Sequence, residues 1–166
     1  MPNLQNMIIR PATRQDYPAI WGILEPVIRA GETYTLPRDM REDEALGYWT
    51  GPDRETFVAV AGTEILGTYY IRPNQQGGGA HVANCGYMTA AHATGRGVAR
   101  AMAEHSLAHA KARGYAAMQF NFVVSTNHRA VALWERLGFV TLCRLPGAFA
   151  HPSQGMVDAL VMFQGL

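Results

Sequence analysis

The pattern of apolar and polar positions predicts alternating strands and helices along the chain. Short apolar or alternating runs indicate strands, and apolar residues three and four positions apart indicate helices. Strands are expected at residues 7–10, 57–61, 65–72, 81–89, 116–124, 139–145 and 156–163, helices at 13–29, 39–49, 98–113 and 127–137, and loops at 31–37, 73–79 and 146–155. This order predicts an α/β fold, with helices on both faces of a mixed sheet.

A glycine-rich turn, HATGRGVAR at residues 92–100, connects an expected strand to an expected helix. The first N–H groups of a helix have no partner within it and lie at the positive end of its dipole, which suits a phosphate or pyrophosphate. Gly95 and Gly97 lack the Cβ atoms that would hold an anion away from the backbone, and Arg96 and Arg100 add positive charge. An ordinary strand-to-helix connection is the alternative interpretation.

Two other phosphate-binding loops do not fit this turn. A P-loop ends in Gly-Lys-Ser or Gly-Lys-Thr, whereas the one lysine of the chain is Lys111. A dinucleotide-binding turn needs a third glycine where Arg100 stands and an acidic residue about 20 positions later, and neither is present.

A second segment, NHRAVALWERLGF at residues 127–139, predicts a short capped helix that ends at a glycine. Together the two segments resemble the GNAT superfamily of N-acetyltransferases. The first family signature, Gln/Arg-x-x-Gly-x-Gly/Ala, falls on Thr94, Gly97 and Ala99. The second, Asn-x-x-Ala-x-x-Leu-Tyr-x-x-x-Gly-Phe, is met at Asn127, Ala130, Leu133, Gly138 and Phe139. The resemblance implies a mostly antiparallel sheet of six to seven strands.

The resemblance also implies that acetyl-CoA is the cosubstrate. Its pyrophosphate would lie on the turn that includes Thr94, Gly95, Arg96, Gly97, Val98, Ala99 and Arg100. The pantetheine arm would lie between the fourth and fifth strands, near Asn127, Ala130 and Trp134. Tyr87, Met88 and Thr89 would offer backbone partners, with one N–H, assigned to Met88, as the oxyanion donor. Plain sheet pairing for residues 87–89 and a helix cap for Asn127 are the alternatives.

Two departures from the family pattern affect the expected mechanism. Trp134 replaces the tyrosine that protonates the leaving thiolate in many members, and an indole N–H is far too weak an acid for that role. Asn84 stands where relatives that acetylate amino acids often have a glutamate base. Glu32 is the first substitute, and His81 and Asp158 are weaker ones. A pocket that lowers the pKa of the amine would need no base.

The acceptor site is expected to draw on Glu32, Tyr34, His81, Asn121, Arg144, Phe149 and His151. Tyr34 and Phe149 would wall a small pocket, and Arg144 or His151 would meet a carboxylate. Surface packing is the alternative for these residues. Cys85 is interpreted as a buried thiol, and the spacing of the histidines predicts no metal site.

Composition is consistent with one domain over residues 1–166. A net charge of +1 gives no reason to expect nucleic acid as a partner. The sequence predicts no signal peptide and no membrane-spanning run, and its two cysteines favour reduced thiols and a cytoplasmic location. A homodimer is left open.

The expected function is therefore direct transfer of an acetyl group from acetyl-CoA to a primary amine. The acceptor is expected to be a small molecule, such as an amino acid or an amine-bearing toxic compound. An acyl-CoA-binding sensor without turnover is the alternative, favoured by Asn84 and Trp134. An unrelated nucleotide-binding protein is a third hypothesis.

Overall fold

Residues 6–166 are described by the computed structural model, and within them seven strands form one mixed sheet. The strands are β1 (Ile8–Pro11), β2 (Glu55–Ala61), β3 (Glu64–Pro73), β4 (Val82–Thr89), β5 (Ala117–Val124), β6 (Val140–His151) and β7 (Gly155–Gly165). Their order in the sheet is β1-β2-β3-β4-β5-β7-β6. Only β4 and β5 are parallel, and the other neighbours are antiparallel. The predicted fold class is confirmed.

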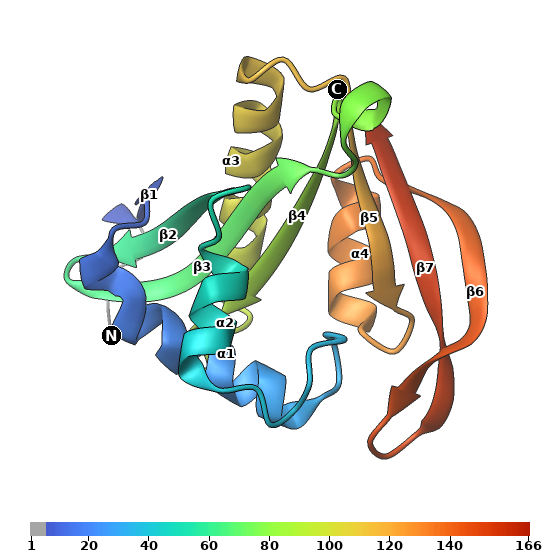
Figure 1. Cartoon of the computed structure of the whole chain (residues 1–166), viewed down its shortest axis with the longest axis horizontal. Helices are drawn as coiled ribbons and strands as arrows, with labels where there is room; N and C mark the ends of the chain where they lie inside the picture. Colours follow the sequence, from blue (N-terminus) through green and yellow to red (C-terminus); the bar gives the residue numbers. More distant parts are fainter. Residues whose placement is uncertain (1–5) are drawn as a thin grey trace.

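Helices cover both faces of this sheet (Figure 1). They are α1 (Tyr17–Ala30), α2 (Glu42–Trp49), α3 (Val98–Ala112) and α4 (His128–Arg136). Successive side chains of a strand point to opposite faces. Thr68 of β3 accepts a hydrogen bond from the indole of Trp49 in α2, whereas the hydroxyl of Tyr69 lies 2.7 Å from Nδ1 of His105 in α3. The α2 and α3 helices therefore lie on opposite faces.

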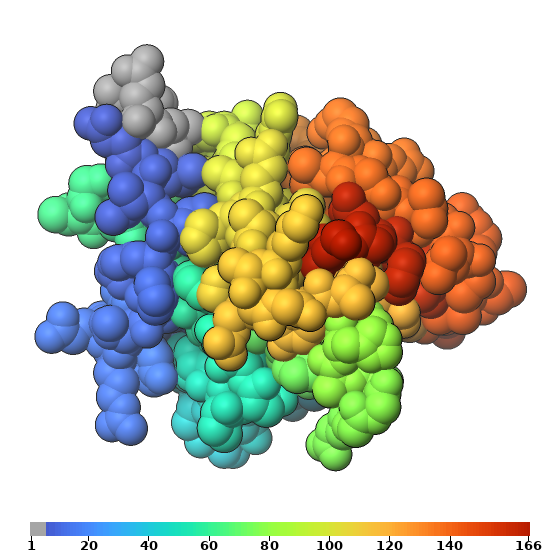
Figure 2. Space-filling model, turned by 90° about the horizontal axis from the view of Figure 1, so that it is seen from above, coloured from blue at the N-terminus to red at the C-terminus, as the bar shows by residue number. Residues whose placement is uncertain are grey.

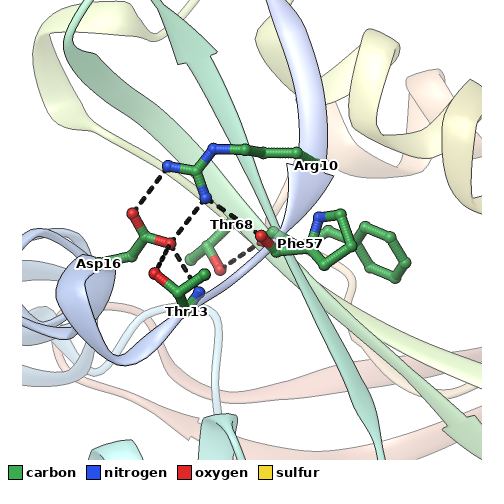
Figure 3. Close-up of polar contacts among 6 residues, drawn as sticks. Arg10, Thr13, Asp16, Phe57 and Thr68 are labelled. Atoms are coloured by element: carbon green, nitrogen blue, oxygen red, sulfur yellow. Dashed lines mark hydrogen bonds and ion pairs between the residues drawn. The ribbon is translucent and has the colours of Figure 1, made fainter.

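An ion pair fixes the start of α1 against β1 (Figure 3). Both guanidinium Nη atoms of Arg10 donate to the carboxylate of Asp16, each at 2.8 Å. The same carboxylate accepts from the Thr13 backbone N–H at 2.7 Å, which forms a capping box between Thr13 and Asp16. Hydrogen bonding to Arg10 lowers the pKa of the buried Asp16 to about 2.

The C-terminal part of the sheet differs from the prediction. Residues 146–155 were expected to form a loop, but β6 continues through Pro146 as far as His151 and pairs with β7. A register shift between Leu145 and Phe149 makes room for Gly147, whose φ is +57°. The loop prediction is wrong because an edge strand tolerates proline and glycine at a bulge.

The last strand lies in the interior of the sheet, between β5 and β6. Figure 2 shows the C-terminal residues in red, between the gold connection from α3 to β5 and the orange strand β6. The Leu166 N–H donates to the Ala116 carbonyl at 3.0 Å, which fixes this end of the chain.

The parallel contact between β4 and β5 is short. Its register includes only Val82 with Ala117 and Ala83 with Met118. Beyond this point the two strands diverge in Figure 1, while β5 continues its pairing with β7. The backbone groups on one side of β4 are therefore left without a neighbouring strand.

Candidate active site

A cavity of about 270 Å³ lies between β4 and β5 where the two strands diverge. Its lining comes from loop residues 33–35, from α2, from β3 to β5, and from α4 with its cap residue Asn127. Tyr48 and Tyr70 lie on the α2 face of the sheet, whereas Ala130 and Trp134 belong to α4 on the opposite face. The cavity therefore joins the two faces of the sheet where the strands separate.

The backbone of β4 alternates between its partner β3 and this cavity. The Ala90 N–H donates to the Leu66 carbonyl at 2.8 Å, so the backbone groups of Met88, two residues earlier, also face β3. The prediction of a Met88 N–H as oxyanion donor is therefore wrong. The groups of Tyr87 and Thr89 point to the other side, toward the gap.

The side chain of Tyr34 forms hydrogen bonds with the backbone groups of Tyr87 that face the cavity. The hydroxyl of Tyr34 accepts a hydrogen bond from the Tyr87 N–H at 2.8 Å and donates one to the Tyr87 carbonyl at 2.9 Å. Burial raises the pKa of Tyr34 far above its ordinary value, so this phenol stays protonated at neutral pH. The predicted pocket residue Tyr34 thus lies in the cavity, bound to β4.

No aspartate, glutamate or histidine belongs to the lining of the cavity within the described part of the chain. Asn84 lies there, and its Nδ2 donates to the Gln119 carbonyl at 3.0 Å. Glu32, the first predicted substitute for the base, lines a neighbouring cavity of about 840 Å³ against α1. The loop brings Thr33 rather than Glu32 to the first cavity.

The two weaker base candidates also lie elsewhere. His81 is exposed in the turn before β4. Asp158 accepts from Arg144 and from the Gly147 N–H, each at 2.9 Å. These hydrogen bonds lower the pKa of Asp158, which stabilises its charged form and weakens it as a base.

The structure separates the predicted acceptor residues into two groups. Tyr34 and Asn121 line the cavity, whereas Arg144, Phe149 and His151 belong to β6. These three residues do not line the cavity because 146–155 is not a loop that folds over the site. It extends the sheet beyond β7 instead.

Several residues that line the cavity were not predicted from the sequence, among them Tyr48 in α2 and Tyr70 and Arg72 in β3. The alternation of β3 shows that Tyr70 and Arg72 share a face. It does not show that this face meets the separation of two later strands. Only the long-range pairing of the sheet supplies that information.

The turn before α3 has the geometry of an anion site. Gly95 and Gly97 have φ values of +78° and +87°, and a Cβ at either position would meet no atom within 4 Å. The Ala101 N–H donates to the Gly97 carbonyl, so the N–H groups of residues 98–100 precede the helical pattern. Arg100 forms an exposed ion pair with Glu104.

Thr94 and Asn127, two residues of the sequence signatures, both form local contacts with the backbone. The hydroxyl of Thr94 faces the Ala90 carbonyl at 3.4 Å. Asn127 caps α4, with its Oδ1 3.4 Å from the Ala130 nitrogen, and it also lines the cavity. Asn127 is therefore placed both as a helix cap and as a cavity residue.

The aromatic wall beside α4 includes Trp134, which packs on Tyr87 and Phe120 with ring centroids 5.0 and 4.7 Å apart. Trp134 has no hydroxyl that could act as an acid. Burial raises the pKa of the Cys85 thiol to about 12, so that it stays protonated. Cys85 is a buried free thiol, as predicted.

Residues 6–166 contain no group of three or more His, Cys, Asp or Glu side chains that could hold a metal ion. None of the helices in this part of the chain has the length and apolar character needed to cross a membrane.

Known proteins share this architecture. The model of the acetyltransferase (GNAT) family matches residues 16–139. N-acetyltransferase aca1 of Schizosaccharomyces pombe is 30% identical over 151 residues, which cover 81% of this chain and 72% of that protein. A GCN5-related N-acetyltransferase from Kribbella flavida is 39% identical, with a TM-score of 0.94 over 99% of this chain and 100% of that structure.

A more distant structure shares the fold. The phosphinothricin acetyltransferase from Sinorhizobium meliloti, solved in complex with acetyl-CoA, is 18% identical with a TM-score of 0.85, over 96% of this chain and 88% of that one. The family match covers most of this chain, including both sequence signatures. The chain belongs to the acetyltransferase (GNAT) family and is an acetyl-CoA-dependent N-acetyltransferase.

Proposed function

We propose that this acetyltransferase acts on the primary amine of a small molecule by direct attack. The observation that carries the proposal is the cavity of about 270 Å³ that joins both faces of the sheet. Such a passage lets a cosubstrate enter from the α4 face and an amine from the α2 face. The loop at 33–35 and Tyr48 border the acceptor side and leave room for a small molecule.

The residues of the chain fit acetyl-CoA. The turn at 95–97 and the first N–H groups of α3 suit its pyrophosphate. The side of β4 that has no strand partner, at Tyr87 and Thr89, can pair with its pantetheine amides and thioester carbonyl once the Tyr34 hydroxyl is displaced from Tyr87. Asn127 lies on the opposite wall. When bound, acetyl-CoA supplies the activated acetyl group.

The acceptor amine must be neutral to attack. With no carboxylate or imidazole in the described lining, the cavity itself has to favour the neutral amine by removing it from water. The amine nitrogen then forms a bond to the acetyl carbon while the carbon–sulfur bond breaks. The amine loses one proton and the CoA thiolate gains one, so the reaction releases no net proton from these two groups. Both protons are exchanged through solvent or the acceptor cavity.

The test is release of CoA thiol from acetyl-CoA by the purified protein against amino acids, polyamines, aminoglycosides and lysine-containing peptides. We expect release with a small amine and an acetylated product of matching mass. Release only with peptides would contradict the small-molecule proposal. No release with any amine, together with a rise in melting temperature on adding acetyl-CoA, would favour a sensor without turnover.

A further inference from the structure

The acceptor end of the cavity is formed by a cluster of two tyrosines and two arginines. The hydroxyls of Tyr48 and Tyr70 lie 3.3 Å apart. The guanidinium carbon of Arg54 lies 4.9 and 4.7 Å from the centroids of these two rings. Tyr48, Tyr70 and Arg72 line the cavity, and Arg54 lies behind the two rings.

This cluster has an excess of positive charge. Asp53 receives two hydrogen bonds from Arg54, at 2.8 and 3.0 Å. The same carboxylate is also the nearest acid to Arg72, whose Nη1 lies 3.7 Å from it. One carboxylate therefore faces two guanidinium groups, and Arg72 is the only charged side chain in the described lining of the cavity.

Two donors of the cluster are buried without an acceptor among the described residues. They are Nε of Arg72 and Nη1 of Arg54. The side chain of Arg54 is only 6% exposed. Buried donors are nearly always paired in folded proteins, and those of guanidinium groups match carboxylate oxygens well. Arg72 lines the cavity, so its unpaired Nε belongs to a side chain that a bound acceptor can contact.

These observations indicate which charged groups the acceptor should carry. A simple cationic amine would meet Arg72 with no acidic side chain in the lining to offset the repulsion. An amine that also carries a carboxylate would supply the missing acceptor. We propose that the acceptor is an amino acid or a close analogue, with its carboxylate held by Arg72 and by the hydroxyls of Tyr48 and Tyr70. This inference rests on the small-molecule function proposed above.

The test compares amino acids with their own amides, which keep the amine and the side chain but lose the negative charge. Binding is measured by calorimetry in the presence of CoA, and acetylation by thiol release. We expect each acid that binds to do so at least about tenfold more tightly than its amide. Arg72→Gln should abolish this preference, whereas Arg72→Lys should keep part of it.

Matched variants separate the charge from the fold. Arg136→Gln removes an exposed arginine in the last turn of α4, outside the cavity, and should leave the preference unchanged. Tyr48→Phe removes one lining hydroxyl and should weaken binding of the acid severalfold. Arg72→Gln should bind acetyl-CoA as the wild type does. If Arg72→Gln does not fold, the comparison of acids with their amides on the wild-type protein tests the carboxylate inference by itself.

The outcomes distinguish this inference from the proposed function. If amides or simple amines are bound and acetylated as well as acids, the acceptor inference is overturned and the small-molecule function stands. If neither the acids nor their amides bind, but polyamines or aminoglycosides are acetylated, the carboxylate inference again fails alone. If no small amine binds or is acetylated, both proposals fail.

Discussion

The hydroxyl of Tyr34 forms hydrogen bonds with both polar backbone groups of Tyr87, at 2.8 Å to the N–H and 2.9 Å to the carbonyl. The pairing of β4 with β5 ends at Ala83, so Tyr87 has no strand partner on this side. The phenol therefore takes the place of a missing strand. A cosubstrate that pairs with the same backbone groups has to displace it.

Replacing Tyr34 with phenylalanine should change stability and cosubstrate affinity in opposite directions. The free protein would lose two hydrogen bonds and leave a buried N–H unpaired, which costs about 1–3 kcal/mol of unfolding free energy. The bound protein loses nothing if acetyl-CoA has already displaced the phenol, so its affinity should rise severalfold. Thermal unfolding and calorimetric titration with acetyl-CoA measure the two effects.

Tyr48→Phe is the matched control for this comparison. It also removes one phenolic hydroxyl from the cavity, but that hydroxyl contacts Tyr70 rather than the backbone of β4. Its affinity for acetyl-CoA should stay at the wild-type level. A weaker affinity in Tyr34→Phe would show that the phenol supports acetyl-CoA rather than competing with it.

Gly97→Glu should remove acetyl-CoA binding with little further effect on the fold. The residue has a φ of +87° and open space beside it, so the substitution strains the backbone by about 1–2 kcal/mol without a clash. A carboxylate at the beginning of α3 would oppose the pyrophosphate, and we expect the dissociation constant to rise on the order of 100-fold.

Gly114→Glu gives the same backbone strain at the opposite end of α3. Gly114 also has a φ of +87° and no atom within 4 Å of a Cβ. Both variants should lose similar stability by thermal unfolding, but only Gly97→Glu should lose affinity. Equal affinities in the two variants would rule out the turn at 95–97 as the pyrophosphate site.

Local patterns were sufficient to predict most of the fold. The apolar run in residues 65–72 and the glycine that follows α3 mark elements whose boundaries depend on neighbouring residues. The prediction failed at Pro146 and Gly147, where a bulged edge strand has the same composition as a loop. Sequence alone does not show that β7 is available as a partner for those residues.

The turn proposed for the cosubstrate is easier to recognise in the sequence than the residues proposed for the acceptor. The turn at 95–97 is a contiguous segment, and its helix start and glycines can be recognised together. The proposed acceptor side combines Tyr34, Tyr48 and Arg72 from separate elements. Their proximity depends on how α1 and α2 pack on β3, which no local spacing encodes.

The ion pair between Arg10 and Asp16 should make stability fall in acid. The pKa of Asp16 is about 2 in the folded protein and near 3.8 when unfolded. Between these values the unfolded chain binds more protons, so the free energy of unfolding decreases as pH falls from about 4 to about 2. We expect a loss of about 1–2 kcal/mol, measured by chemical denaturation across this range.

Asp16→Asn should lose most of that stability already at pH 7 and flatten the acid dependence. Asp43→Asn is the control, because Asp43 pairs with Arg41 on the exposed surface and its replacement should have a much smaller effect. An acid dependence that survives in Asp16→Asn would assign it to other carboxylates.

The pH dependence of acetylation should be set by the pKa of the acceptor amine rather than by a titrating side chain of the protein. With no Asp, Glu or His in the described lining of the cavity, no side chain there changes charge between pH 5 and 8. The rate constant kcat/KM should therefore rise tenfold per pH unit until the amine of the acceptor is neutral. Two acceptors whose amine pKa values differ should show profiles displaced by that difference.

Glu32→Gln tests the strongest alternative in the same experiment. Glu32 lines the neighbouring cavity, so its replacement should leave kcat and the shape of the profile unchanged. If both acceptors instead share one inflection and Glu32→Gln removes it, Glu32 reaches the amine when acetyl-CoA is bound, through a movement of the loop at 31–36. A shared inflection that persists in Glu32→Gln would point to another group of the protein. A profile that moves with the acceptor would show that the cavity accepts an amine already deprotonated, which would explain how Asn84 can line the cavity where the family resemblance led us to expect a base.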